Sequence, residues 1–226
     1  MPLIEIACFD VKSALIASEA GADRIELCDN ADVGGTTPPL EWLYVTQGVV
    51  KCPVNVMIRP RGGNFVYTNS EFDAMKNAVQ GLKSSRMVDG FVFGVLHDTQ
   101  TIDIERTTEL VNLADPLPCT FHRAFDEAKD LPQALEDVIS CGIKTILTSG
   151  GASTASQGTV RLAQLAKNAG DRIVIMPGGG VRSSNIDSLE KETRAGIYHS
   201  SALLDTDTLA NAQEIKNLRA RLHQEP

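Results

Sequence analysis

Short apolar segments rich in β-branched residues recur along this chain, and each one ends in a polar or glycine-rich signature. In chain order the signatures are IELC, MIRPRGG, TFHRAF, LTSGG, MPGGGV and YHSSA. Each signature is followed by a segment with the apolar spacing of a helix, a pattern typical of parallel strands that are buried on both faces. The recurrence therefore predicts that these signatures lie together at one end of a parallel sheet.

The same pattern predicts eight strands and eight helices. We expect strands at residues 3–8, 23–28, 54–60, 90–96, 118–124, 145–150, 172–177 and 195–201. We expect helices at residues 11–20, 40–49, 71–83, 103–113, 131–140, 158–169, 183–190 and 209–222. Eight such units fit a closed α/β fold, the (β/α)₈ TIM barrel, with its site at the C-terminal ends of the strands. An open doubly wound sheet would carry a glycine-rich turn after the first strand, where this chain has CFDVKS, so we expect no nucleotide cofactor.

Composition indicates a single domain and argues against nucleic-acid and membrane partners. With 226 residues and 42% hydrophobic composition the chain can build one large core, and no linker divides it, so we expect a single domain over residues 1–226. The net charge of −8 and the pI near 5.0 oppose nucleic-acid binding but leave room for a local pocket for one small anionic ligand. The segment MPLIEIACFD lacks the basic start of a signal peptide, and no apolar run approaches the roughly 20 residues of a membrane span. We therefore expect a cytoplasmic protein with no membrane partner, and a homodimer because barrels often pair.

The five cysteines are odd in number and widely spaced, and no CxxC occurs. In a reducing compartment the simplest interpretation is that they are small buried apolar residues, with metal ligation or reactivity as the alternative. A disulfide framework is not expected.

Two glutamates are expected to point into the barrel. Side chains alternate along a strand, which places Glu5 on one inward face and Glu26 on another. Two buried carboxylates need cations, a metal or a raised pKa, and Arg59 and Arg61 in MIRPRGG are the candidate cations. An ion network that only fills the barrel is the alternative, but desolvation makes such networks poor stabilising devices, which favours ligand handling.

His122, at the end of the expected fifth strand, is the first candidate for acid–base catalysis. Nearby carboxylates would favour its protonated form, and Asp126 follows in the loop to orient a ring or a cation. His199 in YHSSA is a second candidate. The lysines lie before strands or on helix surfaces, which disfavours a Schiff-base mechanism.

Glycine and hydroxyl residues in the loops after the last three strands predict an anion-binding site. Backbone N–H groups in such turns, completed by a helix N-terminus, bind phosphate or carboxylate. The candidate residues are Thr148, Ser149, Gly150, Gly178, Gly179, Gly180, Ser200 and Ser201.

The motifs IELCDNADVGGTTPP, IRPRGGNFVY, TFHRAFD, ILTSGG and GGGVRSSN, followed by YHSSA, resemble the CutC copper homeostasis proteins over nearly the whole chain. The resemblance implies a (β/α)₈ barrel linked to copper tolerance, with Glu5, Glu26, Arg59, Arg61, His122, Asp126 and His199 as a polar cluster at its mouth. The resemblance also includes Cys28, which lies in the IELC motif. After YHSSA the chain has only a short link, residues 203–208, before its last helix.

Two functions follow from these residues. The first is copper homeostasis with copper bound directly, for which Cys8 and Cys28 are the candidate ligands because Cu(I) prefers thiolates. The strand alternation, however, puts their sulfur atoms on opposite faces if both glutamates point inward. The second is a lyase, isomerase or hydrolase acting on a small anionic or phosphorylated substrate, with His122 as acid or base and a divalent metal held by the carboxylates as an optional aid.

Overall fold

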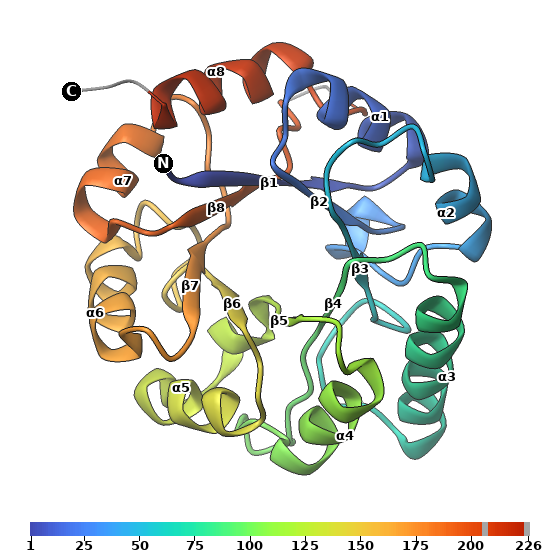
Figure 1. Cartoon of the computed structure of the whole chain (residues 1–226). Helices are drawn as coiled ribbons and strands as arrows, with labels where there is room; N and C mark the ends of the chain where they lie inside the picture. The colour runs from blue at the N-terminus through green and yellow to red at the C-terminus, as the bar shows by residue number, and fades with distance from the viewer. Residues whose placement is uncertain (205–207, 224–226) are drawn as a thin grey trace.

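Eight parallel strands form the centre of the molecule in this computed structural model, which describes residues 1–204 and 208–223 (Figure 1). The strands are β1 (Leu3–Cys8), β2 (Arg24–Leu27), β3 (Val54–Met57), β4 (Gly90–Phe93), β5 (Cys119–Phe121), β6 (Thr145–Thr148), β7 (Val174–Pro177) and β8 (Ile197–Ser200). Their hydrogen-bonded order is β8, β1, β2, β3, β4, β5, β6, β7. Figure 1 shows β7 beside β8, so the sheet closes into a barrel.

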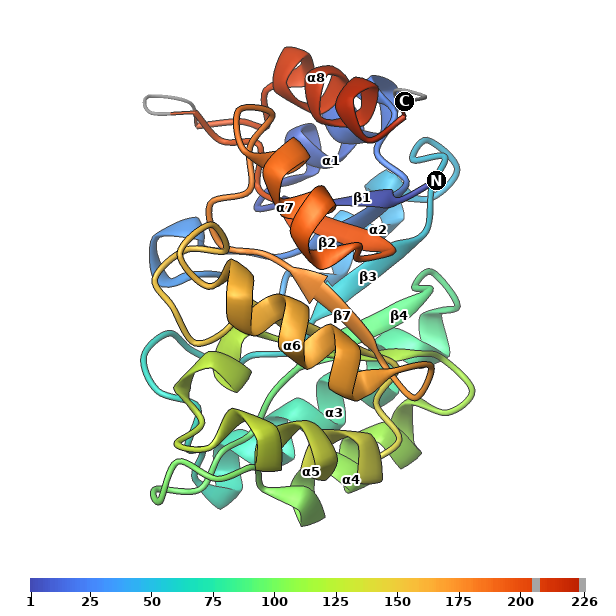
Figure 2. The same ribbon diagram turned by 90° about the vertical axis from the view of Figure 1, so that its left-hand side faces the viewer.

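A ring of helices surrounds the strands, and Figure 2 shows α6 and α7 covering the side of the barrel that contains β7. The helices are α1 (Val11–Ala20), α2 (Leu40–Thr46), α3 (Asn69–Ser85), α4 (Ile104–Ala114), α5 (Leu131–Ser140), α6 (Thr159–Ala169), α7 (Ile186–Thr193) and α8 (Ala212–Leu222). Two short 3₁₀ helices, η1 (Ala31–Val33) and η2 (Arg123–Glu127), lie in the loops after β2 and β5. Both of these loops are at the C-terminal end of the barrel.

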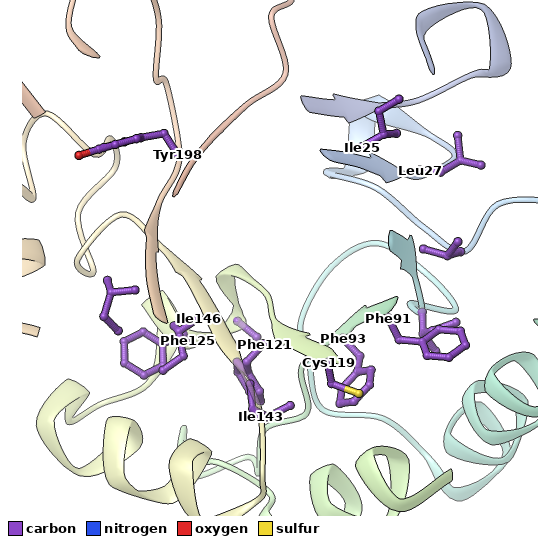
Figure 3. Close-up of a cluster of buried hydrophobic side chains, with 14 of the residues drawn as sticks. Ile25, Leu27, Phe91, Phe93, Cys119, Phe121, Phe125, Ile143, Ile146 and Tyr198 are labelled. Atoms are coloured by element: carbon purple, nitrogen blue, oxygen red, sulfur yellow. The ribbon is translucent and has the colours of Figure 1, made fainter. Parts of the chain in front are cut away.

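The apolar side chains pack in two places. The larger cluster fills the layer between the sheet and the helices, and Figure 3 shows Ile25, Phe93 and Phe121 among its buried members. A smaller set, including Leu147, Met176 and Ile197, lies on the alternate positions of the strands and fills part of the barrel interior. Because the inward positions of β1, β2 and β8 instead carry Glu5, Glu26 and His199, the upper interior of the barrel is polar.

Helix boundaries follow local capping. Asp10 caps α1 by accepting a hydrogen bond from the Ser13 backbone N–H, and Gly21 ends the helix at a φ of 95°, which favours glycine. Thr68 and Glu71 form a reciprocal capping box at the start of α3. These residues set where each chain segment leaves the helical layer and turns toward the next strand.

The expected α/β (β/α)₈ barrel is confirmed, with all eight predicted strands and helices present in the described residues. The strands expected at residues 54–60, 90–96 and 118–124 are each shorter than predicted and end at residues 57, 93 and 121. The chain turns into loops at these points, and His122 becomes the N-cap of η2. Residues 205–207 of the short link before α8 lie outside the described residues. No helix within residues 1–204 and 208–223 is long and apolar enough to span a bilayer.

Candidate active site at the barrel mouth

Three strands bring four charged side chains together inside the barrel. Glu5 on β1 accepts from Arg24 on β2, and its other oxygen lies 2.8 Å from Nδ1 of His199 on β8. The second ring nitrogen of His199, Nε2, lies 3.5 Å from Oε2 of Glu26 on β2. His199 therefore lies between two carboxylates, and Arg24 balances the charge of Glu5.

Burial and neighbouring charges move the pKa values of the two carboxyl groups in opposite directions. Burial alone would raise the pKa of Glu5, but the hydrogen bond with His199 and the charge of Arg24 outweigh it and lower that pKa. Burial raises the pKa of Glu26 to about 7, against the opposing effect of the His199 charge. Burial would lower the pKa of His199, but its bond to Glu5 and the charges of both glutamates raise it. Glu5 is thus the carboxylate that stays charged near neutral pH, and Glu26 is the carboxyl group that titrates there.

Glu26 faces a small cavity at the C-terminal mouth of the barrel. The residue is 2% exposed, and its Oε1 atom has no hydrogen-bond partner in the described chain. The cavity has a volume of about 110 Å³, and the polar or sulfur-containing side chains in its lining are those of Glu26, Cys28, Met57, Arg59, His122, Arg123 and His199. Ligand pockets for drug-sized molecules are roughly 300–1,000 Å³, so this cavity fits a molecule of only a few heavy atoms.

His122 lies across this cavity with one free ring nitrogen. Its Nδ1 accepts a hydrogen bond from the Ala124 backbone N–H at 3.2 Å, which leaves the proton of the neutral ring on Nε2. Nε2 is buried and has no partner in the described residues. Any side chain at Gly94 would clash with this ring, because a Cβ there would lie 2.6 Å from Nδ1.

The protonated His122 expected from the sequence is wrong. Burial and the positive charge of Arg59 lower the pKa of His122 to about 3, so the ring is neutral near pH 7. Glu5 and Glu26, the carboxylates expected to stabilise its protonated form, contact His199 instead. His122 is therefore a hydrogen-bond donor toward the cavity rather than a cation.

Arg59 lines the same cavity without a carboxylate partner. It is 5% exposed, and its two terminal nitrogens donate to the backbone carbonyls of Val33, Gly35 and Gly63. Its Nε atom has no hydrogen-bond partner in the described residues, and its guanidinium lies 4.8 Å from the centre of the Phe65 ring. Arg59 thus fixes the loops after β2 and β3 and leaves a buried positive charge beside the cavity.

Arg61 lies away from the cavity. Its Nε donates to Glu71 at 2.6 Å, and its other nitrogens bind backbone carbonyls of its own loop at Asn64 and Val66. The side chain of Arg61 is 37% exposed. Of the two arginines in MIRPRGG, Arg59 lines the cavity that Glu26 faces and Arg61 does not.

Asp126 fills the anion-binding turn that was expected after the sixth strand. Its carboxylate accepts hydrogen bonds from the backbone N–H groups of Ser149 and Gly151 and from the hydroxyl of Thr148. These donors already bind a carboxylate, and the Gly150 backbone N–H donates to the Thr148 hydroxyl, so the turn does not offer them to a ligand. Asp126 also accepts from Nε of Arg123 at 2.9 Å, which holds that side chain at the rim of the cavity.

The loops after β7 and β8 are tied to one another rather than to the cavity. Arg182 donates to the hydroxyl of Ser200 and to the Leu203 carbonyl, and lies 3.5 Å from the hydroxyl of Ser201. Gly178, Gly179 and Gly180 are not in the cavity lining, although Gly179 leaves room for Arg123, whose Nη1 would lie 3.2 Å from a Cβ at that position. The anion site predicted from these residues stays a prediction.

The two candidate copper ligands face different layers. Cys8 packs in the layer between the sheet and the helices, whereas Cys28 packs with Met57 and Val92 inside the barrel. Burial raises the pKa of both thiols well above 9, so both carry a proton at neutral pH. The sulfur atom that packs in one cluster with Cys28 is the thioether of Met57, not the thiol of Cys8.

Glu5, Glu26 and His199 are close enough to hold a metal ion. One ligand atom from each lies within 4.8 Å of the others, and oxygen and imidazole ligands suit a divalent cation. Arg24 already balances Glu5, so the group is also stable as an ion network without a metal. A wider surface groove of about 740 Å³, between α3 and α4, contains none of the residues predicted from sequence.

Three residues at the site were not predicted. Arg24 lies two positions before Glu26 on the same strand, but its pairing with Glu5 depends on the register Glu5 to Arg24 between β1 and β2. Met57 carries no polar signal, and Arg123 gives no sign in the sequence that it reaches the cavity. Each of these roles depends on which loop or strand lies opposite, and a single sequence does not show that.

The fold and site define a (β/α)₈ barrel protein with a buried carboxylate and histidine cluster at the C-terminal mouth. Comparison with protein families gives a match over residues 2–204 to the CutC family, so the chain belongs to the CutC family.

Individual relatives agree with this assignment. A CutC family protein of Chromobacterium violaceum is 44% identical over 88% of this chain and 81% of its own length. The human copper homeostasis protein cutC homolog is 42% identical over 91% of this chain and 75% of its own length. The crystal structure of a putative copper homeostasis protein CutC from Streptococcus agalactiae superposes with a TM-score of 0.84 at 32% identity, covering 89% of this chain and 99% of that one.

Proposed function

We propose that the barrel mouth is the active site of an enzyme that moves a proton on a small polar substrate, with Glu26 as the proton acceptor and donor. One observation carries this proposal: Glu26 is buried and its Oε1 atom has no partner, although it faces a cavity lined with polar groups. A buried carboxyl group without a partner is costly unless a ligand completes it. Its pKa of about 7 keeps both protonation states populated near neutral pH, as acid–base catalysis requires.

The surrounding residues suit the same step. Glu26 takes a proton from a C–H group of the substrate, the electron pair is delocalised onto an adjacent carbonyl oxygen, and the proton is returned to the same or a neighbouring carbon. Nε2–H of the neutral His122 is placed to donate to the oxygen that gains charge, which is an effective arrangement when the donor itself stays neutral. His199, held by Glu5, supports the second oxygen of Glu26. Isomerases and lyases use such a step.

The test does not require a known substrate. Wild-type protein is incubated with a small-molecule extract in D₂O, and mass spectrometry identifies metabolites that gain deuterium. We expect the protein to label at least one metabolite and the Glu26→Gln variant to lose that labelling. Glu71→Gln is the matched control, because it makes the same chemical change at a carboxylate paired with Arg61 outside the cavity. If no metabolite depends on Glu26 for labelling, the proposal fails.

Copper binding is the second candidate function. It is supported by the names of the human and streptococcal relatives and by two sulfur atoms, those of Cys28 and Met57, that line the cavity beside two imidazoles. Soft thiolate and thioether ligands are those that Cu(I) prefers. We propose Cys28 and Met57, rather than Cys8 and Cys28, as the ligand pair, because Cys8 lies in the other layer.

Anaerobic titration with Cu(I) against a competing chelator separates these pairs. Cys28→Ser and Met57→Leu should each weaken Cu(I) binding by about tenfold or more, whereas Cys8→Ser should leave it unchanged. A loss of affinity in Cys8→Ser equal to that in Cys28→Ser would restore the pair expected from the sequence. For a divalent ion held by Glu5, Glu26 and His199, Zn²⁺ affinity should instead be lost in His199→Ala and kept in Cys28→Ser.

We also propose that the protein acts in the cytoplasm. The five cysteines are all free thiols, which suits a reducing compartment. Fractionation of cells that produce the tagged protein is the direct test.

A further inference from the structure

One wall of the mouth cavity carries positive charge that nothing in the described chain neutralises. Arg59 is 5% exposed and forms no ion pair, since its terminal nitrogens bind only backbone carbonyls. An uncompensated buried guanidinium is strongly unfavourable, and side chains of this type are normally paired with a carboxylate or a phosphate. The carboxylates of Glu5 and Glu26 do not pair with it.

Unused N–H donors lie on the same wall. Nε2 of His122 is buried and without a partner, and Nε of Arg59 is buried without a hydrogen-bond partner, although the Arg59 side chain also interacts with the Tyr67 hydroxyl outside the cavity lining. Arg123 is held by Asp126 through Nε and donates from Nη2 to the Ser149 hydroxyl at 3.0 Å, while its Nη1 has no partner in the described residues. All three side chains line the cavity. Three side chains that carry N–H donors thus surround the space that Glu26 faces from another strand.

We infer that this cavity binds a small carboxylate, with the carboxylate oxygens held by Arg59, His122 and Arg123 and the adjoining carbon group turned toward Glu26. This inference rests on the proposed proton transfer at Glu26 and names its substrate class: a short hydroxy or oxo carboxylic acid. A carboxylate fits better than a phosphate, because a dianion in a dry cavity needs more donors than the three available here. The volume of about 110 Å³ also favours an acid of only a few heavy atoms.

His122 is suited to this role by its fixed tautomer. The Ala124 backbone N–H holds Nδ1 as an acceptor, so the free Nε2 presents a proton to an anionic oxygen. Asp126 likewise fixes the orientation of the Arg123 guanidinium before any ligand binds, because it accepts a hydrogen bond from Nε. Donors fixed in advance lose little conformational entropy on binding.

Calorimetry and NMR with pyruvate as the probe test the inference without any turnover. We expect pyruvate to bind at millimolar concentration or tighter and to shift the ¹⁵N resonance of His122 Nε2. Arg123→Gln should weaken pyruvate binding by about tenfold or more, the loss expected for one charged hydrogen bond. The control, Arg61→Gln, removes a guanidinium that pairs with Glu71 outside the cavity and should leave the affinity unchanged.

Two further comparisons make the result decisive. His122→Gln, whose amide can still donate, should bind pyruvate more tightly than His122→Phe. Hydroxyacetone, which lacks the carboxylate, should bind at least tenfold more weakly than pyruvate and should not respond to Arg123→Gln. The inference is overturned if pyruvate, lactate and glycolate all fail to bind, if methyl phosphate binds more tightly than all three, or if Arg61→Gln weakens binding as much as Arg123→Gln.

The outcome is separable from that of the proposed function. Carboxylate binding that depends on Arg123, together with no deuterium labelling that depends on Glu26, would leave the ligand class standing and remove the proton transfer. Labelling of a neutral metabolite, with no carboxylate binding, would do the reverse.

Discussion

Individual buried charges determine both the chemistry of this site and its effect on the stability of the folded protein. Glu26 is kept away from water by the barrel, and the same burial that raises its pKa to about 7 also makes its charged form unfavourable in the folded state. Glu5 avoids that cost because His199 and Arg24 both contact its carboxylate. Two carboxyl groups on neighbouring strands therefore have different roles, and the difference comes from one arginine and one imidazole.

The titration of Glu26 predicts that stability falls as pH rises through the range from 4.5 to about 7. In this window the folded state holds a proton on Glu26 that the unfolded state, with a pKa near 4.5, has released. The free energy of unfolding should fall by on the order of 3 kcal/mol from this group. The raised pKa of His199 acts in the same direction, because its stabilising contribution is present below pH 6.5 and lost as pH rises through its folded-state pKa.

Urea unfolding at pH 5, 6, 7 and 8 measures this effect. The Glu26→Gln variant should show a clearly smaller fall in the free energy of unfolding than the wild type. Glu71→Gln should keep the wild-type slope, because Arg61 lowers the pKa of Glu71 to about 2, so Glu71 titrates below the range measured. A Glu26→Gln profile parallel to that of the wild type would show that Glu26 does not titrate near neutral pH.

Among the structural elements, the short helix η2 and the loop after β6 are joined by one carboxylate. Asp126 accepts from two backbone N–H groups, from two hydroxyl groups and from Arg123. Asp126→Ala should destabilise the protein by about 3 kcal/mol, because several buried donors lose their acceptor at once. Urea unfolding at pH 7, followed by circular dichroism, gives the value.

Asp130→Ala is the matched control for this substitution. Asp130 is the N-cap of α5 and accepts one hydrogen bond, from the Gln133 backbone N–H, so its loss should cost only about 1 kcal/mol. Equal destabilisation by the two substitutions would mean that Asp126 acts only as a local cap. A larger loss at Asp126 would support its role in holding two loops and Arg123 together.

The elements themselves could be predicted from the sequence much better than the partners of the charged residues. Helices α1 and α5 begin and end at the expected residues, since apolar spacing and capping residues are local signals. The cation beside Glu5, in contrast, was expected to be Arg59 or Arg61 and is Arg24. The reason is that the loop after β3 folds back so that Arg59 binds carbonyls of the preceding loop and Arg61 binds Glu71. Such loop conformations depend on contacts between distant segments.

At the scale of the whole molecule, barrel closure brings together residues that are far apart in the sequence. Glu5 and His199 are 194 positions apart, yet the pairing of β1 with β8 places them opposite one another. The acidic side of the site comes from β1, β2 and β8, and the donor side comes from the loops after β3 and β5. A ligand in the cavity would therefore contact both sides of the barrel at once.

The homodimer expected from the sequence stays a prediction, and the surface around α2 is where we expect the two copies to meet. Tyr44 and Val45 on α2 are 62% and 55% exposed, and Val49 in the following turn is 54% exposed. Exposed apolar side chains on one helix and the turn after it suit pairing of two copies through a two-fold axis, because the same surface of each copy then covers that of the other. Light scattering should give twice the 24.3 kDa chain mass, and Tyr44→Glu combined with Val45→Lys should give a monomer. Val160→Glu, at an 84% exposed position on α6, should leave the dimer intact. A monomeric wild type, or a dimer that survives both α2 substitutions, would exclude pairing through this surface.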